Sequence, residues 1–172
     1  MRLVLSLLCL FTALFAVKAD TPLIGPEYTG NVDAQTQAQA AKDVFTRLLG
    51  KERSDQFSIT IVKKDGNDYF HIAPQDDIIA ITASNGVSAC RALKWYLNNI
   101  CNIGITWRGD NLAYLPETLP KEFTPTEETT PFKYRYIFNN CVFGYETAFW
   151  HWEGWEHMID ILAFNGINMP AM

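Results

Sequence analysis

The sequence predicts an α/β fold in two parts: a small N-terminal α/β domain, and after it the beginning of a parallel α/β domain. Three observations support this prediction. Stretches with apolar residues at helical spacing alternate with short β-branched runs in the first part. A proline-rich stretch without any apolar period follows. The last part then reads strand, loop, helix, tight turn and strand, which is the pattern of one βα unit.

Residues 1–19 have the composition of a cleaved secretory signal peptide. Arg2 precedes the apolar run 3–17, and small residues occupy the two positions that signal peptidase reads in Val17-Lys18-Ala19. The run is too short to span a membrane comfortably, and an uncleaved anchor is the alternative. We therefore expect a protein of the secretory pathway, lysosomal or extracellular, with no membrane association after cleavage. Residues 20–32 hold two prolines and two glycines and are expected to form an irregular lead-in.

Charge and cysteine content exclude several classes of protein. The formal net charge is −5, and removal of residues 1–19 takes away two of the 14 basic residues and no acid, which makes it −7. Without a Lys/Arg cluster, zinc-finger spacing or Gly-rich phosphate loop, we expect no nucleic-acid partner. The signal peptide carries one of the four cysteines, so a disulfide-rich scaffold is excluded. Cys90 and Cys101 would be about 16 Å apart along a helix, beyond disulfide reach.

Two helices are predicted in the N-terminal domain, which we place at residues 33–115. The first helix has Asp33 as its N-cap, an apolar stripe that includes Phe45, and Gly50 at its end. The second follows a capping sequence at residues 84–86 and runs to about Asn98. Its apolar stripe indicates a purely structural helix.

The strands of this domain are short and rich in β-branched residues. Three of them, separated by turn sequences, predict a meander of neighbouring strands at residues 57–62, 69–73 and 77–83. A closing pair of strands is predicted at residues 104–108 and 111–115, around Gly109-Asp110. Residues 116–133 follow with four prolines and many threonines and glutamates, which predicts a linker or an extended crossing strap.

Residues 134–172 predict the first βα unit of a larger domain. The strand is expected at residues 134–139, the helix from about Phe149, a stop at Asn165-Gly166, and a second strand from Ile167. A complete parallel barrel needs about 250 residues, so this part supplies only its start.

The helix of this unit carries acidic residues that invite a catalytic interpretation. Helical spacing places four apolar residues on one face, Trp152, Trp155, Ile159 and Leu162, and four polar residues on the opposite face, Glu153, Glu156, His157 and Asp160. A solvent-exposed face explains these carboxylates more simply than acid–base chemistry does. His151 and His157 lack the H-E-x-x-H spacing of a zinc site, so we expect no metal.

The loop after the first strand is the better candidate for a binding site. Asn139, Cys141 and Tyr145 lie there, at the carboxyl end of the strand, which faces the active site in α/β barrels. An amide, a small thiol and a phenol suit the hydroxyl and amide groups of a sugar. Aromatic packing of the loop is the alternative.

The motifs of this part resemble those of one enzyme family. They are R-Y-x-x-N-x-C-x-x-x-Y from Arg135, W-x-W-x-x-W-E from Trp150, I-D from Ile159, and N-G-I-N at residues 165–168. Together they resemble family 89 of the glycoside hydrolases, the alpha-N-acetylglucosaminidases. Upstream, S-N-G-V-x-A-x-R-A-L-K-W-Y-L and G-I-x-W resemble the N-terminal domain of that family in order and length. The sequence departs from the family pattern at Phe149 and His151, where Trp and Asp are expected.

This resemblance implies a small α/β domain followed by an incomplete (β/α)8 barrel. It also implies retaining hydrolysis of terminal non-reducing N-acetylglucosamine from alpha-N-acetylglucosaminides, with heparan sulfate degradation as the lysosomal setting. Two glutamates about 5 Å apart carry out such a reaction, and in this family both belong to later barrel strands. The resemblance therefore transfers no catalytic residue, cofactor or metal to this sequence. It does imply that Asn139, Cys141 and Tyr145 contact the substrate.

We therefore expect the N-terminal portion of such an enzyme, either a fragment of a longer gene product or a truncated gene model, that is inactive alone. Its partners would be glycans with terminal alpha-linked N-acetylglucosamine, bound through the full-length enzyme, whose oligomeric state is open. The alternative is a secreted, non-catalytic module that binds glycans or a protein. We also expect residues 33–115 to fold alone, and residues 134–172 to expose apolar surface and to promote association.

Overall fold

The computed structural model describes residues 32–64, 66–138 and 146–171. Residues 33–172 form one compact unit, and the account below concerns its described part. The predicted signal peptide and residues 20–31 of the lead-in lie outside the described residues. Within the described part, no helix is long and apolar enough to cross a membrane.

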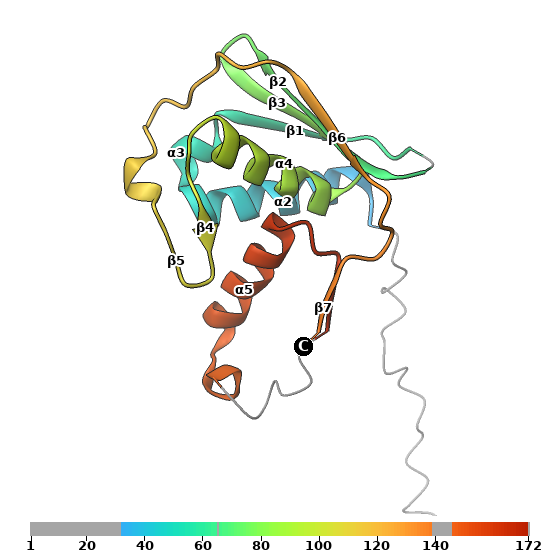
Figure 1. Cartoon of the computed structure of the whole chain (residues 1–172), viewed down its shortest axis with the longest axis vertical. Helices are drawn as coiled ribbons and strands as arrows, with labels where there is room; N and C mark the ends of the chain where they lie inside the picture. Colours follow the sequence, from blue (N-terminus) through green and yellow to red (C-terminus); the bar gives the residue numbers. More distant parts are fainter. Residues whose placement is uncertain (1–31, 65, 139–145, 172) are drawn as a thin grey trace, which may run out of the picture. The chain divides into compact units, whose positions relative to one another are not determined.

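Helices cover one face of the N-terminal sheet (Figure 1). They are α2 (Ala34–Leu49), the short α3 (Lys51–Ser54) and α4 (Gly86–Asn99). Asp33 and Asn85 are the N-caps of the two long helices, and each side chain accepts a 2.9 Å hydrogen bond from the backbone N–H three residues further on. The chain leaves α2 at Gly50, where φ is 84°, a backbone conformation that favours glycine. Both predicted helices are confirmed.

The N-terminal sheet has four strands in the order β1-β3-β2-β6. They are β1 (Phe57–Ile61), β2 (Asp68–Gln75), β3 (Ile78–Ala83) and β6 (Thr126–Thr130). β1 pairs with β3 in parallel, whereas β2 pairs antiparallel with both β3 and β6. The predicted meander is therefore wrong in its strand order. β2 and β3 form the expected hairpin. The hairpin joins β1 through its second strand, β3, so that Phe57 pairs with Ile79 and Ile59 with Ile81.

The predicted linker, residues 116–133, is in large part integral to this domain. Leu119 is buried in the core, and its N–H donates to Gln56 Oε1 at 2.8 Å. The buried Tyr96 hydroxyl donates to the Pro120 carbonyl at 2.6 Å. Strand β6 then completes the sheet along β2. Prolines interrupt regular structure on either side of β6, but the threonines of β6 themselves favour an edge strand.

A small hairpin lies beside this sheet. It consists of β4 (Ile105–Thr106) and β5 (Gly109–Asp110), so its turn is at Trp107-Arg108 and not at Gly109-Asp110 as predicted. The predicted strand at residues 111–115 is a 3₁₀ helix (Leu112–Tyr114). The Asp110 carboxylate accepts from the Leu112 N–H at 2.9 Å, which bends the chain directly after β5.

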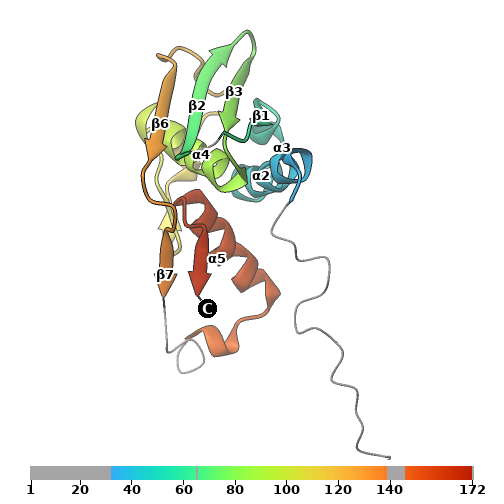
Figure 2. The same cartoon turned by 90° about the vertical axis from the view of Figure 1, so that its right-hand side faces the viewer.

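The C-terminal part is a βα unit, as predicted. After β7 (Tyr136–Phe138), a short 3₁₀ helix (Glu146–Phe149) precedes α5 (Trp152–Phe164), and the chain returns as β8 (Met169–Ala171). β7 and β8 are parallel, with Tyr136 opposite Met169. Figure 2 shows β7 and the dark red β8 running side by side, away from α4.

One hydrophobic core joins both parts. Aromatic rings cross it edge to edge from α2 to α4, through Phe45, Phe57 and Tyr96, with centroids 5.3 and 5.5 Å apart. The same cluster contains Ile161 and Phe164 of α5. The βα unit is therefore packed into the core of the N-terminal domain.

Candidate functional site

The predicted substrate-binding residues Asn139, Cys141 and Tyr145 lie outside the described residues. The structure does describe β7, the strand that leads into them, and the 3₁₀ helix that follows them. It therefore fixes the strand end from which the loop departs. Whether the three side chains come together stays a prediction.

Helix α5 does not have the single apolar face that its sequence predicts. Trp152 is 65% exposed and Ile159 is 39% exposed, although helical spacing predicts both on the apolar face. The buried residues are Asp160, Ile161, Leu162 and Phe164. Leu162 lines a cavity with Ile137 of β7 and Ile167, which precedes β8, whereas Ile161 and Phe164 belong to the N-terminal core. Because α5 packs against two partners, its buried surface is wider than one helical stripe.

The prediction that Asp160 faces solvent is wrong. Asp160 is 3% exposed, and both of its oxygens accept hydrogen bonds from the Arg47 guanidinium, at 2.6 Å from Nε and 2.7 Å from the terminal nitrogen. This bidentate bond raises the pKa of Arg47. Asp160 is thus the buried half of an ion pair between α5 and α2.

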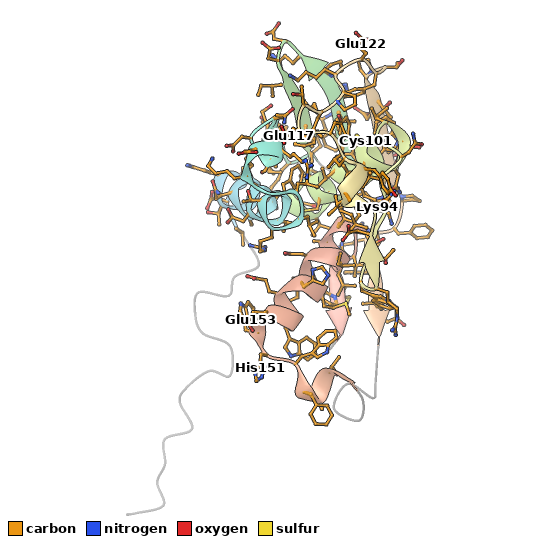
Figure 3. All side chains as sticks on the ribbon, turned by 90° about the vertical axis from the view of Figure 1, so that its left-hand side faces the viewer. Lys94, Cys101, Glu117, Glu122, His151 and Glu153 are labelled. Atoms are coloured by element: carbon orange, nitrogen blue, oxygen red, sulfur yellow. The ribbon has the colours of Figure 1, made fainter. Side chains whose placement is uncertain are left out.

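The other acidic side chains of α5 are closer to the predicted solvent exposure. Glu153 and the neighbouring His151 are exposed, at the end of α5 that is distant from α4 (Figure 3). Glu156 is half-buried. In barrels the reacting groups come from the carboxyl ends of strands. These helix residues therefore do not form a catalytic carboxylate pair.

Arg135, directly before β7, connects the two parts of the unit at a second place. Its guanidinium donates to Asp68 Oδ2 at 2.7 Å, to the Gly166 carbonyl at 2.6 Å and to the Phe132 carbonyl at 2.7 Å. Its backbone N–H donates to Asn168 Oδ1 at 2.8 Å, and its carbonyl accepts from the N–H of Asn168 at 3.0 Å. The amino ends of β7 and β8 are therefore tied both to each other and to β2.

A polar cavity of about 520 Å³ lies next to this junction, with Asp68, Asn85, Lys133 and Asn168 in its lining. Its side chains already hold the chain in place. Asn85 Nδ2 donates to Asp68 Oδ1 at 2.7 Å, and Asn168 Nδ2 donates to the Lys133 carbonyl at 2.9 Å. Because these polar groups bond to one another, we assign them a structural role: they join the amino ends of the strands to the N-terminal domain.

A second cavity, of about 420 Å³, is mostly apolar and includes Trp107, Ile137 and Leu162 in its lining. Lys94 at its edge donates to the side-chain carbonyl of Asn165. Burial, followed by the nearby charge of Arg91, lowers the pKa of Lys94. This cavity lies between the β4–β5 hairpin and the βα unit.

Two tryptophans pack together at the amino end of α5. The rings of Trp150 and Trp155 are 5.5 Å apart and inclined by 69°. Gly154 permits this, because a Cβ at position 154 would lie 3.2 Å from Cγ of Trp150. The amino end of a barrel helix follows the loop at the catalytic face. The two tryptophans thus lie at the end of α5 that corresponds to the catalytic face of a barrel.

Among the described residues, no group of three or more His, Cys, Asp or Glu side chains is arranged to hold a metal ion. Cys90 and Cys101 are not paired with each other. Burial raises the pKa of the Cys90 thiol to about 12. Cys90 is therefore inert in the folded chain.

Arg47 and Asp68 anchor the two junctions, and neither can be identified as an anchor from the sequence. Arg47 lies next to the apolar stripe of α2, and Asp68 stands at the start of a strand. Neither position has a local pattern that would distinguish it, and the partner of Arg47 is 113 residues away. Arg135 belongs to a recognisable sequence motif, but the motif does not indicate its contacts.

Comparison with known proteins assigns the family. The sequence model of the alpha-N-acetylglucosaminidase N-terminal domain matches residues 39–121, and that of the alpha-N-acetylglucosaminidase tim-barrel domain matches residues 135–172. The chain belongs to the alpha-N-acetylglucosaminidase family. Human alpha-N-acetylglucosaminidase is 33% identical to it over 142 residues, which cover 80% of this chain and 19% of the human protein. The chain thus spans about a fifth of the length of this relative.

Solved structures of family 89 give the same result. The Clostridium perfringens family 89 glycoside hydrolase in complex with PUGNAc matches with a TM-score of 0.74 and 32% identity, over 79% of this chain and 16% of that one. The same values of TM-score, identity and coverage hold for a variant with two glutamates replaced by glutamine, in complex with its substrate GlcNAc-alpha-1,4-galactose. The predicted fold class, an N-terminal α/β domain that leads into a barrel, is confirmed, as is the resemblance to the family.

Proposed function

We propose that this chain supplies the N-terminal domain and the first βα unit of an alpha-N-acetylglucosaminidase. The enzyme would remove terminal non-reducing N-acetylglucosamine from alpha-N-acetylglucosaminides, with retention of configuration. One observation carries the proposal: two domain models of the same family match consecutive parts of the chain in the family order. The parallel β7–α5–β8 unit is what the start of such a barrel requires.

The reaction needs groups beyond those described here. Retaining hydrolysis uses two carboxyls about 5 Å apart, one as nucleophile and one as acid and base. Glu153 is exposed on a covering helix, and Asp160 is engaged with Arg47. We assign both catalytic glutamates to later barrel strands. On this basis the 172 residues alone are catalytically inert.

The sugar pocket would include Asn139, Cys141 and Tyr145. They follow β7, whose carboxyl end corresponds to the catalytic face of a barrel. The Clostridium relative binds GlcNAc-alpha-1,4-galactose, so its substrate carries the acetamido and hydroxyl groups that an amide and a phenol can recognise.

The setting of the activity follows from the signal-like composition of residues 1–19. The enzyme would enter the secretory pathway and act in the lysosome or outside the cell. Heparan sulfate, which contains alpha-linked glucosamine, is the proposed natural substrate in the lysosomal case.

The test is an assay of the complete gene product on an aryl alpha-N-acetylglucosaminide and on GlcNAc-alpha-1,4-galactose. We expect release of N-acetylglucosamine from both and none from the beta anomer of the aryl substrate. The 172-residue chain should give no turnover above a blank. Absence of turnover by the complete product, together with saturable glycan binding, would favour a non-catalytic module instead.

The pocket assignment has its own test in the active protein. Replacement of Asn139 by Ala should raise KM about tenfold, the effect of one lost hydrogen bond of about 1.4 kcal/mol. Asn99→Ala, at an exposed position at the end of α4, is the matched control and should leave KM unchanged. Equal KM values in both variants would show that the Asn139 side chain does not bind the substrate.

A further inference from the structure

The boundary between the two family domains does not coincide with a structural boundary. The domain models divide the chain between residues 121 and 135, yet residues 33–172 form one compact unit. Ile161 and Phe164 of α5 are 3% and 0% exposed and belong to the core cluster of the N-terminal domain. The start of the barrel is thus packed into another domain.

The contact is made at a definite end of the βα unit. Asp160 and Phe164 lie in the carboxyl-terminal half of α5, and Arg135 and Asn168 precede β7 and β8. The N-terminal domain therefore lies at the amino ends of the barrel strands (Figure 1). Residues at that end of a barrel serve stability, whereas the opposite end carries catalysis.

Two ion pairs hold the unit at separate elements. Arg47 of α2 holds the helix through Asp160, whose side chain is 4% exposed. Asp68 of β2 holds the strands through Arg135, with side-chain exposures of 24% and 16%. Loss of Arg47 would leave a buried carboxylate without a partner, which is far more costly than loss of a surface pair.

Among the described residues of the βα unit, the most buried apolar side chains, Ile161 and Phe164, pack in the core of the N-terminal domain. β7 and β8 are three residues each and form a two-stranded sheet. Such a sheet is marginal in water, and parallel strands require cover on both faces. The N-terminal domain, in contrast, has a four-stranded sheet covered by α2 and α4.

From these observations we propose that the N-terminal domain is a folding template for the first unit of the barrel. Arg47–Asp160 and Arg135–Asp68 are the two ion pairs that attach the unit to it, and the shared core around Phe164 is its apolar contact. Within residues 33–172, the βα unit depends on the N-terminal domain for its stability, and not the reverse. The inference is independent of the proposed enzymatic activity.

The role of the Arg47–Asp160 ion pair is tested with Arg47→Met in the whole chain. Cys90 of α4 is a built-in probe, because it is 2% exposed and belongs to the same core cluster as Ile161 and Phe164 of α5. We expect the labelling rate of Cys90 by a thiol reagent, and the hydrogen exchange rate of α5 amides, to rise at least tenfold. Exchange in β2 and β3 should change less than twofold.

Lys51→Met is the matched control, because Lys51 forms an exposed ion pair with Asp55 just after α2. It should change neither rate. Arg47→Lys keeps the charge without the bidentate bond and should raise both rates by an intermediate amount. This variant provides the test if Arg47→Met folds poorly. Unchanged Cys90 labelling and α5 exchange in both Arg47 variants would overturn the proposal.

The direction of dependence is tested with two buried residues of the shared core. Leu93→Ala, in α4, should accelerate exchange in the N-terminal sheet and in α5 together. Phe164→Ala, in α5, should accelerate exchange in α5 and β8 and leave β2 and β3 protected. If Phe164→Ala accelerated β2 and β3 as much as α5, the two parts would be one cooperative unit and the template would be refuted.

Discussion

The N-terminal domain and the βα unit obtain their stability from different sources. The fully buried Phe45 and Leu93 belong to the same domain as the elements around them. The most buried apolar residues of the βα unit, Ile161 and Phe164, instead belong to the core of its neighbour, and Phe149 and Trp152 are largely exposed. A domain boundary drawn from sequence families therefore need not separate units that fold independently.

Polar contacts show the same contrast. The caps Asp33 and Asn85 bond to residues three positions away. The contacts that fix the βα unit span 113 residues for Arg47–Asp160 and 67 for Arg135–Asp68. Local sequence thus specifies the helices of one region, whereas tertiary contacts specify the position of the other.

The largest effect is expected from Phe45→Ala. Phe45 is fully buried with its ring against Phe57, so the variant should lose about 4 kcal/mol of unfolding free energy through the cavity. Urea unfolding followed by circular dichroism measures this, and hydrogen exchange should show that α5 loses protection as well. Phe149→Ala, at a position 85% exposed, is the control. If α5 kept its protection from hydrogen exchange in Phe45→Ala, the βα unit would not depend on the core of the N-terminal domain.

Arg135→Met should have a smaller effect that is confined to the βα unit. It removes donors from the Gly166 and Phe132 carbonyls and a cation from Asp68, for a loss of about 2 kcal/mol. Faster exchange of the Asn168 and Met169 amides, which bond to the Arg135 carbonyl, would report it. Lys133→Met is the control, and equal exchange in the two variants would count against a junction at Arg135.

Exposed aromatic residues should make the βα unit the site of self-association. Replacement of Trp152 by Gln together with Phe149 by Ser removes apolar surface without touching the shared core. Sedimentation velocity should show a shift of the 172-residue chain toward monomer. Val62→Thr changes an exposed apolar residue of the N-terminal domain and should leave association unchanged. If Val62→Thr reduced association more than the double variant, the associating surface would lie on the N-terminal domain.

The smallest effect concerns the cap of α2. The side-chain hydrogen bond from Thr36 lowers the pKa of Asp33 below its ordinary value of 3.8. A lowered native pKa means that the cap stabilises α2 above pH 3.8 and that this contribution is lost as the pH falls through the native pKa. The Thr36 amide chemical shift should follow this titration, without change in α5. Asn at position 33 caps without titrating and should abolish the pH dependence.

Local features of the fold could be predicted from sequence. The caps, the two long helices and the strand–helix–strand order depend on residues within a few positions of each other, and all were predicted. The order β1-β3-β2-β6 could not be, because parallel pairing of β1 with β3 leaves no local mark. Strand β6 was missed because prolines flank it and its partner β2 lies far upstream.

The errors on α5 have a similar cause. A helical wheel assumes one apolar face, but α5 lies between the strands and the N-terminal domain, so Asp160 is buried where Arg47 can neutralise it. A pairing over 113 residues is not visible in one sequence. The assignment of Asn139, Cys141 and Tyr145 to a sugar pocket stays a prediction, since these residues lie outside the described part.

Strand β6 has a consequence for the order of events during synthesis. It ends at Thr130, five residues before Arg135, and it completes the sheet that carries Asp68. Chains emerge from the ribosome amino end first, at about 5–20 residues per second. The surface that receives Arg135 and α5 is therefore assembled from sequence already translated when β7 appears. The N-terminal sequence that packs against α5 is thus available to the βα unit from the moment its helix is synthesised.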